Sequence, residues 1–323
     1  DISKCKLSKF LKKNFSKIYT DLDVFFSFYK NESITITGTN GKSTTAKILH
    51  EALIDQKRDS RLVGNIGNPV LSEKKITDKT VFVIEASSYQ LDYSKIFSTK
   101  YAIILNISGD HLERHKNLYN YVNAKFKLLR YQNQGSFAYV KKKDELITKK
   151  IRKNNYKSKI YKVDLNNLKT ITKKIKNKYF ITDGNKENLS FIVEIAAKLK
   201  LSKKKLIKTI NNFKGLDYRQ QIIFDKKNLT IINDSKSTSF ASSENILKNL
   251  NHAYWLVGGI PKKGDKFKLS KIKSKNLKAF VFGSNREKFS EILQNKLSVK
   301  SFENLQEAIQ EIFLNIKQNK LSK

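Results

Sequence analysis

Methionine is absent from this 323-residue sequence, cysteine occurs once, and long apolar runs are lacking. Because no initiator Met is present, we expect the native start to lie upstream of Asp1. The single Cys5 cannot form an internal disulfide and stands outside any Cys or His spacing typical of a metal site, so a reducing cytoplasm is the expected location. Purely apolar stretches, such as residues 82–84 and 102–105, are all far shorter than the roughly 20 residues that span a bilayer, so no membrane helix is expected.

Acidic residues are also scarce, because 29 Asp and Glu stand against 65 Lys and Arg, for a formal net charge of +36 at pH 7. So basic a surface raises the question of nucleic acid, since neutralising phosphates is the main use of such a charge. Only seven of the cations are arginines, however, and the lysines are spread from end to end. Base readout and bidentate phosphate contacts favour Arg. We therefore expect no specific nucleic-acid partner and interpret the lysine runs as solvated faces.

A phosphate-binding loop is predicted where the β-type run at residues 34–37 gives way to a helical pattern. Gly38 and Gly41 would leave room for phosphate oxygens against backbone N–H groups. Lys42 would supply a point charge, and Ser43 would supply a hydroxyl for Mg²⁺. An incidental glycine turn between a strand and a helix is the simpler alternative.

Short β-rich runs alternate with helical patterns along the chain, which predicts an α/β fold with a mostly parallel sheet covered on both faces. Two domains are expected, because 323 residues exceed one ordinary core. They are a central P-loop domain at residues 34–215 and a smaller Rossmann-like α/β domain at 216–323, after a leading segment at 1–33. The expected strands are residues 34–37, 80–85, 101–106, 136–140, 221–224, 229–232, 253–257 and 279–282, and the expected helices are residues 44–56, 118–131, 188–199, 202–213, 240–250, 286–294 and 305–319.

Polar groups follow two of the strands expected beside the phosphate loop. Glu85 ends the run VFVIE, and Asp110 and His111 follow the run AIILNIS. Ligand groups collect at the carboxyl ends of parallel strands, so these side chains are expected near the loop. A carboxylate next to a phosphate loop is a natural Mg²⁺ ligand or water orienter. A surface acid and a structural histidine are the alternatives.

Several motifs together resemble the Mur ligases, a family of ATP-dependent amide ligases of peptidoglycan synthesis. TGTNGKST at residues 37–44 is similar to the family's phosphate loop, which also lacks the first glycine of the general motif, where Ile36 stands here. The other matching motifs are GNIG at 64–67, EASSYQL at 85–91, LNISGDH at 105–111 and AK at 124–125. NDSKST at 233–238 is similar to the form found in the D-glutamate-adding members, as are GG at 258–259 and KKGD at 262–265.

The resemblance implies an ATP- and Mg²⁺-dependent enzyme that adds D-glutamate to UDP-N-acetylmuramoyl-L-alanine through an acyl phosphate, as a monomer. It implies that Lys125 is carbamylated and that closure of the two domains assembles the site. The catalytic residues would be Lys42, Glu85, His111, Lys125, Arg219 and Lys236, and the metal-side residues Ser43, Glu85, His111 and Lys125. The nucleotide-binding residues would be Gly38, Thr39, Asn40, Gly41, Lys42, Ser43, Thr44, Asn188, Arg219 and Asp234, and the substrate-binding residues Asn65, Ser87, Asp110, Lys236, Thr238 and Lys263.

Parts of the family pattern have no counterpart in this sequence. The family begins with a domain that holds UDP, of which residues 1–33 would be a remnant, and it ends with a strand and a serine-rich loop that grips D-glutamate. We therefore expect the chain to be truncated at both ends, and to bind Mg·ATP but ligate slowly. Glu187 and Phe191 stand where the family has His and Asn, which leaves the contacts to the nucleotide base open.

Two alternatives remain at this point. A sister Mur enzyme or a folylpolyglutamate synthase would share the phosphate loop but differ at residues 233–238. A basic P-loop NTPase that binds nucleic acid would need no muramoyl substrate, and its binding would depend steeply on salt.

Overall fold

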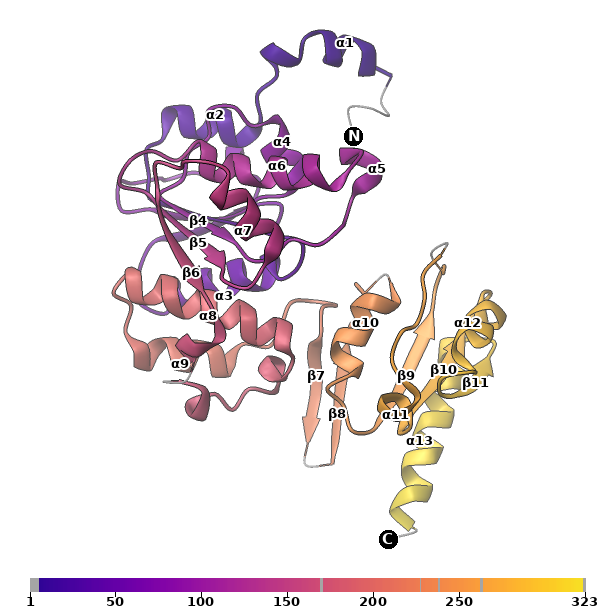
Figure 1. Ribbon diagram of the computed structural model, residues 1–323. Coiled ribbons are helices and arrows are strands. Elements are labelled where there is room, and N and C mark those ends of the chain that lie inside the picture. Colours follow the sequence, from indigo (N-terminus) through magenta and orange to yellow (C-terminus); the bar gives the residue numbers. More distant parts are fainter. Residues whose placement is uncertain (1–5, 169–170, 227, 238, 262–263, 322–323) are drawn as a thin grey trace. The chain divides into compact units, whose positions relative to one another are not determined.

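The computed structural model describes residues 6–168, 171–226, 228–237, 239–261 and 264–321. The chain forms two compact units (Figure 1). Unit 1 comprises Asp1–Phe180 and Gly184–Phe213, and unit 2 comprises Ile181–Asp183 and Lys214–Lys323.

Within the described residues, unit 1 is built on a six-stranded parallel sheet with the strand order β2-β3-β1-β4-β5-β6. The register places Ile36 of β1 opposite Glu85 of β3, and Thr37 of β1 opposite Ile104 of β4. Every residue of β1, β3 and β4 is buried, as expected for a parallel sheet covered on both faces. The predicted α/β class is therefore confirmed. The strands are β1 Ser33–Thr37, β2 Ser60–Gly64, β3 Val81–Glu85, β4 Tyr101–Ile104, β5 Phe137–Lys141 and β6 Lys159–Val163.

Helices cover the two faces of this sheet. Phe82 and Ile84 of β3 share a buried cluster with Phe26 of α2 and Phe126 of α6. Side chains alternate along a strand, so the intervening Val83 points to the other face, where α3 packs on β1, β2 and β3. The helices are α1 Ser8–Lys13, α2 Asp21–Phe28, α3 Lys42–Ile54, α4 Ser88–Tyr93, α5 Leu112–His115, α6 Leu118–Arg130, α7 Glu145–Arg152, α8 Asp183–Lys198 and α9 Lys203–Asn212, and the 3₁₀ turns are Phe15–Lys17, Val70–Ser72, Leu165–Leu168, Thr172–Lys174 and Lys178–Ile181.

The two outermost strands of the sheet, β2 and β6, were not expected from the sequence. Both are only partly buried and contain charged residues, with the sequences SRLVG and KIYKV. An edge strand has one neighbour, so its apolar pattern is weaker than that of a central strand. The helix α3 also begins at Lys42, two residues before the expected start, because Gly41 takes a left-handed conformation and forms the N-cap.

Unit 2 contains an antiparallel hairpin and, among its described residues, a three-stranded parallel sheet with the strand order β11-β10-β9. The hairpin strands are β7 Gln221–Lys226 and β8 Leu229–Asn233, and the sheet strands are β9 Ala253–Gly258, β10 Leu277–Phe282 and β11 Ser298–Phe302. The helices are α10 Phe240–Leu247, α11 Lys271–Ser274, α12 Arg286–Leu293 and α13 Leu305–Leu321. This confirms the smaller α/β part, although β11 and α11 were not expected.

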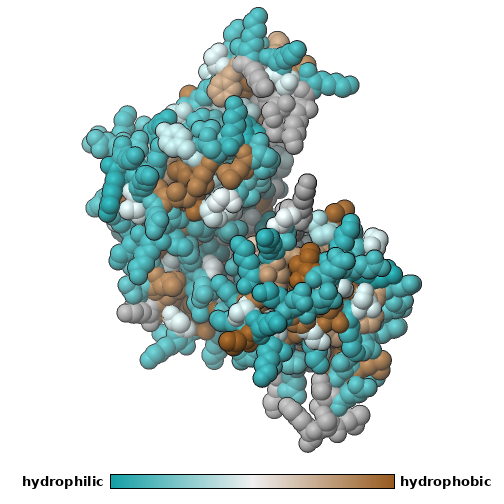
Figure 2. All heavy atoms as spheres, turned by 45° about the vertical axis from the view of Figure 1, so that its right-hand side comes forward, coloured by the Kyte–Doolittle hydropathy of each residue, from teal (hydrophilic) through white to brown (hydrophobic). Residues whose placement is uncertain are grey.

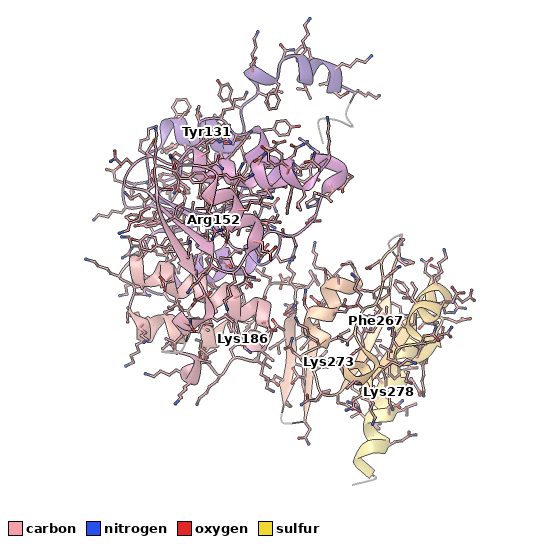
Figure 3. All side chains as sticks on the ribbon, in the orientation of Figure 1. Tyr131, Arg152, Lys186, Phe267, Lys273 and Lys278 are labelled. Carbon is pink, nitrogen blue, oxygen red and sulfur yellow. The ribbon has the colours of Figure 1, made fainter. Side chains whose placement is uncertain are left out.

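An aromatic group forms part of the core of unit 2. Phe267, labelled in Figure 3, lies 5.9 Å from Phe240 of α10 and 5.7 Å from Trp255 of β9 between ring centroids. Phe289 of α12 contacts Phe240 from another side at 5.9 Å. These rings join the loop before α11 to the sheet and its helices.

In the part of the chain that the structure describes, no helix combines the length and the apolar character needed to cross a membrane. Hydrophilic side chains cover most of the face seen in Figure 2, with apolar residues in smaller patches between them. This distribution agrees with lysines spread over the whole sequence.

Candidate active site

The phosphate loop lies between β1, which ends at Thr37, and α3, which begins at Lys42. Gly41 has φ +86°, a conformation that L side chains rarely adopt. A Cβ added to Gly41 would lie 2.0 Å from Oδ1 of Asn188, so this position also has no room for a side chain. Glycine is therefore required at position 41 both by the backbone conformation and by the packing of Asn188.

Residues after β4 hold the loop in place. The backbone N–H of Thr39 donates to the Asn106 carbonyl at 2.9 Å, and the N–H of Asn40 donates to Oδ1 of Asn106 at 2.9 Å. The Thr39 hydroxyl donates to the Ser108 carbonyl at 3.1 Å, and it lies 3.1 Å from the Tyr121 hydroxyl. The loop is thus fixed by side chains and backbone groups outside its own motif.

Two lysines meet at the carbonyl oxygen of Gly38. Lys42 Nζ donates to it at 3.0 Å and to the Thr39 carbonyl at 2.9 Å. Lys125 Nζ, on α6, donates to the Gly38 carbonyl at 2.8 Å. Lys125 is 1% exposed, and burial, followed by the charge of Lys42, lowers its pKa well below the usual range. This environment favours the neutral amine, which is the nucleophilic form of a lysine.

Glu85 lies at the carboxyl end of β3 and is 1% exposed. Its Oε1 accepts a hydrogen bond from Asn65 Nδ2 at 2.9 Å. Its Oε2 is also buried and has no hydrogen-bond partner within the described residues. A buried anionic oxygen without a partner is costly. A divalent cation would satisfy it, so the donor set here fits a metal ion.

His111 forms the N-cap of α5 and has φ +53°. Its Nε2 lies 3.4 Å from Oδ2 of Asp110, and its Nδ1 lies 3.4 Å from the Tyr89 hydroxyl. Within the described ranges, no group of three or more His, Cys, Asp or Glu side chains is arranged to hold a metal. A cation at this edge would therefore need further oxygen ligands, such as a hydroxyl, water or substrate phosphate, which is the usual coordination of Mg²⁺.

Six of the predicted residues line one cavity of about 380 Å³. They are Lys42, Asn65, Ser87, Asp110, His111 and Lys125. Ser88, Tyr89 and Tyr121 line it too and were not predicted. The sequence held a signal for each, since Ser88 and Tyr89 directly follow a predicted residue and Tyr121 lies one helical turn before Lys125.

Three other predicted residues of unit 1 lie around the loop rather than in the cavity lining. Ser43 is half-buried in the first turn of α3. The Thr44 hydroxyl is buried and lies 3.1 Å from the Tyr179 hydroxyl. Asn188, on α8, is 4% exposed and packs against Gly41.

The predicted residues of unit 2 gather beside the hairpin. Oδ1 of Asp234 accepts from the Gln220 N–H at 3.0 Å, and Oδ2 accepts from the Ser237 hydroxyl at 2.6 Å. Burial raises the pKa of Asp234, against these two hydrogen bonds and the charge of Arg219. The N–H of Lys236 donates to the Tyr218 carbonyl at 2.9 Å, so the segment after β8 is tied to the turn that carries Arg219. Thr238 and Lys263 lie outside the described residues.

Two sequence comparisons, one with family profiles and one with curated proteins, indicate the same protein family. The sequence profile of the Mur ligase middle domain matches residues 36–211. A curated relative, UDP-N-acetylmuramoylalanine–D-glutamate ligase of Rickettsia felis, is 33% identical over 315 residues, which cover 92% of this chain and 70% of the relative.

Solved structures share the fold. MurF from Acinetobacter baumannii aligns with a TM-score of 0.64 at 17% identity, over 93% of this chain and 73% of that chain. MurF ligase from Thermotoga maritima, solved in complex with ADP, aligns with a TM-score of 0.61 at 15% identity, over 93% of this chain and 83% of that chain.

Proposed function

This chain belongs to the Mur ligase family, and we propose that it joins D-glutamate to the carboxylate of UDP-N-acetylmuramoyl-L-alanine, with Mg·ATP as the energy source. It is an ATP-dependent ligase of peptidoglycan-precursor synthesis, in line with its curated relatives. We choose D-glutamate for two reasons. The curated relatives are named as D-glutamate ligases and match most of this chain, and residues 233–238 have the sequence NDSKST.

The observation that supports the proposal most is one edge of the sheet that brings together a phosphate loop, a buried amine and a buried carboxylate oxygen with no hydrogen-bond partner among the described residues. Lys42 and Lys125 both donate to Gly38 of the loop. Glu85, with Oε2 left unpaired in the described part of the chain, bonds Asn65 at the same edge of the sheet. Phosphoryl transfer needs this combination of cationic and metal-binding groups, because catalysis there is mostly positioning and charge stabilisation.

In this proposal the loop amides and Lys42 hold the β- and γ-phosphates of ATP. The ammonium of Lys42 bonds two carbonyl oxygens of the loop, those of Gly38 and Thr39. Phosphate oxygens carry more charge than carbonyls and would compete for this ammonium. Gly38, Thr39, Asn40, Gly41, Ser43 and Thr44 supply the surrounding backbone, and Asn188, Arg219 and Asp234 are proposed to contact the nucleotide.

The residues proposed to hold Mg²⁺ are Ser43, Glu85 and His111. When bound, the cation would neutralise charge on the phosphates and on the transferred phosphoryl group. The buried Oε2 of Glu85, which has no hydrogen-bond partner in the part of the chain that the structure describes, supports this assignment.

Lys125 is proposed to carry a carbamate. Its neutral amine would attack CO₂, forming an N–C bond and releasing one proton to water, and the product is an anion. The lowered pKa of Lys125, caused mainly by burial, supports this because only the neutral amine reacts. The carbamate would remove a buried cation beside Lys42 and put an anionic group on the metal side of the cavity.

The substrate carboxylate would then attack the γ-phosphorus of ATP, releasing ADP and forming an acyl phosphate. The amine of D-glutamate would attack the acyl carbon, and inorganic phosphate would leave.

The muramoyl substrate is proposed to face Asn65, Ser87 and Asp110. The incoming amino acid and the reacting carboxylate are proposed to face Lys236, Thr238 and Lys263. Arg219 is proposed to contact the transferred phosphoryl group. We also propose residues 34–215 as the ATP-binding domain and 216–323 as the ligase domain.

The test is ADP release by the chain expressed within its complete reading frame. We expect release that requires both UDP-N-acetylmuramoyl-L-alanine and D-glutamate, with L-glutamate and other amino acids giving little activity. Release that requires a different amino acid would favour a sister ligase. Release without any muramoyl substrate would contradict the proposal.

A further inference from the structure

His115 lies beneath the cavity and is not one of the residues that line it. It is 3% exposed and ends α5, whose N-cap is His111. Its Nε2 lies 3.0 Å from the hydroxyl of Ser88, the first residue of α4. Its carbonyl oxygen accepts a hydrogen bond from Asn120 Nδ2 at 2.9 Å, so the backbone of His115 is held as well.

Two tyrosines that line the cavity pack against the His115 ring. The ring centroid of Tyr89 lies 5.7 Å from that of His115, and the centroid of Tyr121 lies 5.3 Å from it. The Tyr89 hydroxyl lies 3.4 Å from Nδ1 of His111, and the Tyr121 hydroxyl lies 3.1 Å from Oγ1 of Thr39 in the phosphate loop. A single imidazole thus supports the two hydroxyl groups that reach the His111 turn and the loop.

The turn that carries His111 needs such an anchor. The helix α5 has four residues, which is too short to be stable alone. The flanking residues His111 and Lys116 have φ of +53° and +69°, which are unfavourable for residues with a Cβ. Leu112 is 40% exposed, whereas His115 is buried. The contacts of His115 therefore help to hold the turn, together with Arg114, whose guanidinium contacts Asp92 and Tyr93 of α4.

The histidine and serine do not form a nucleophilic pair for a substrate. Both residues are 3% exposed, and the Ser88 hydroxyl lies 3.0 Å from Nε2 of His115, although Ser88 itself lines the cavity. Burial lowers the pKa of His115, with Asp92 opposing and Arg114, Lys125 and His111 adding to the decrease. A neutral ring adds no further cation near Lys125.

We propose that His115 is a positioning residue of the ligase reaction, which fixes the spacing between the phosphate loop and the His111 turn through Ser88, Tyr89 and Tyr121. The proposal rests on the proposed function, because that spacing matters only if phosphates and His111 act together. Displacement of a reacting group by about 1 Å can lower the rate of an enzyme by about 100-fold.

The same unit offers a matched control. His50, on α3, places Nδ1 2.9 Å from the hydroxyl of Ser60 on β2. Burial, followed by Lys47 and Arg61, lowers its pKa to about 4. His50 lines a separate cavity formed by α3 and α9, which contains none of the predicted site residues. A substitution at His50 therefore removes a comparable His–Ser contact away from the reaction.

The experiment compares H115F, H115Q and S88A with H50F, all made in the complete reading frame. Four quantities are measured: kcat for ADP release with both substrates, KM for ATP, the nucleotide Kd in EDTA by calorimetry, and Tm. We expect H115F and S88A to lower kcat about tenfold, with KM and the metal-free Kd within about twofold of the native values. H115Q keeps a hydrogen-bonding group toward Ser88 and should recover most of kcat. H50F should lower Tm and leave kcat unchanged.

Equal kcat values for H115F, H50F and the native protein would overturn the proposal, as would a metal-free Kd of H115F that rises by about the same factor as kcat falls. If H115F does not fold, S88A removes the same contact from the other side, and native kcat in S88A would overturn the proposal. A double H115F/S88A variant should lose no more than either single variant, because both remove one contact. Failure of the native protein to release ADP would contradict the proposed function itself, which separates the two outcomes.

Discussion

The side-chain nitrogens of Lys42 and Lys125 share one acceptor, the carbonyl oxygen of Gly38, at 3.0 and 2.8 Å. Two ammonium groups so close together repel each other, and this repulsion is one cause of the lowered pKa of Lys125. Burial, followed by this repulsion, therefore favours the neutral form of Lys125. We relate Lys42 to phosphate binding and Lys125 to modification.

Substitution of Lys42 by Ala should lower kcat by about 10³-fold or more, because it removes a cation that stabilises charge on the transferred phosphoryl group. Tm should change little, since Lys42 is only half-buried. The matched control is K47A, five residues along α3, where the lysine forms a 3.4 Å ion pair with Glu51. Steady-state ADP release by K42A near the K47A value would show that the loop does not act on ATP.

Substitution of Lys125 by Ala should abolish turnover, and short carboxylic acids added to the assay should restore part of it. The added anion would occupy the place of the carbamate, which Ala leaves empty. The control is K127A, on the same helix, which should not respond to added acid. Labelled bicarbonate should give a carbamate signal in the NMR spectrum of native protein and none in K125A. Absence of both rescue and signal would exclude the carbamate.

Substitution of Gly41 by Ala should weaken nucleotide binding at least tenfold, about 1.4 kcal/mol. Two causes contribute, the left-handed φ of +86° and the 2.0 Å approach of a new Cβ to Asn188 Oδ1. The control is G135A, where φ is +81° and nothing lies within 4 Å of the added Cβ. G135A measures the backbone cost alone, and calorimetry should show unchanged nucleotide affinity there. Equal affinity for G41A and G135A would mean that the loop does not contact the nucleotide.

Asp23 should control the acid stability of unit 1. This buried carboxylate accepts hydrogen bonds from the backbone N–H groups of Lys95, Ile96 and Phe97 and from the Ser94 hydroxyl. Burial raises its pKa, but these bonds and that from Thr20 outweigh burial, and the net pKa lies below the usual 3.8. A depressed pKa contributes stability above the unfolded-state pKa, and that stability is lost as the pH falls through the folded-state pKa.

We therefore expect D23N to lower the free energy of unfolding by about 2–4 kcal/mol at pH 7. The difference in free energy of unfolding between D23N and the native protein should decrease as the pH falls from about 5 to about 2, because the native carboxylate becomes protonated in this range. Urea unfolding across this range measures both effects. D21N, in the same first turn of α2, is the control and should show the native pH dependence. If the difference in free energy of unfolding between D23N and the native protein stays constant down to pH 2, Asp23 does not control the acid stability of unit 1.

The sequence predicts those parts of the site that depend on contiguous residues or on strand ends. The order of strand, glycine loop and helix is local, so Lys42 and Ser43 could be assigned to the loop from their spacing alone. Glu85 and His111 could be placed near it because carboxyl ends of parallel strands share one edge. The register of Ile36 opposite Glu85 shows why that rule works here.

Other features depend on contacts between segments far apart, which no local pattern encodes. The hydrogen bond from Asn40 in the loop to Asn106 joins residues that are 66 positions apart in the sequence. The contact between His115 and Ser88 joins residues that are 27 positions apart. The edge strands β2 and β6 carry charged residues because one side of each lacks a neighbouring strand, so their apolar pattern is weak. The burial of Lys125 could not be predicted either, because Lys is usually exposed.

The most direct test of the account follows an oxygen atom from substrate to product. The carboxylate of UDP-N-acetylmuramoyl-L-alanine is labelled with heavy oxygen and supplied with Mg·ATP and D-glutamate to the chain in its complete reading frame. An acyl phosphate transfers one carboxyl oxygen to phosphorus, so phosphorus NMR should detect one heavy oxygen in each inorganic phosphate released. Phosphate that is released in step with amide formation but carries no label would contradict attack of the substrate carboxylate on ATP.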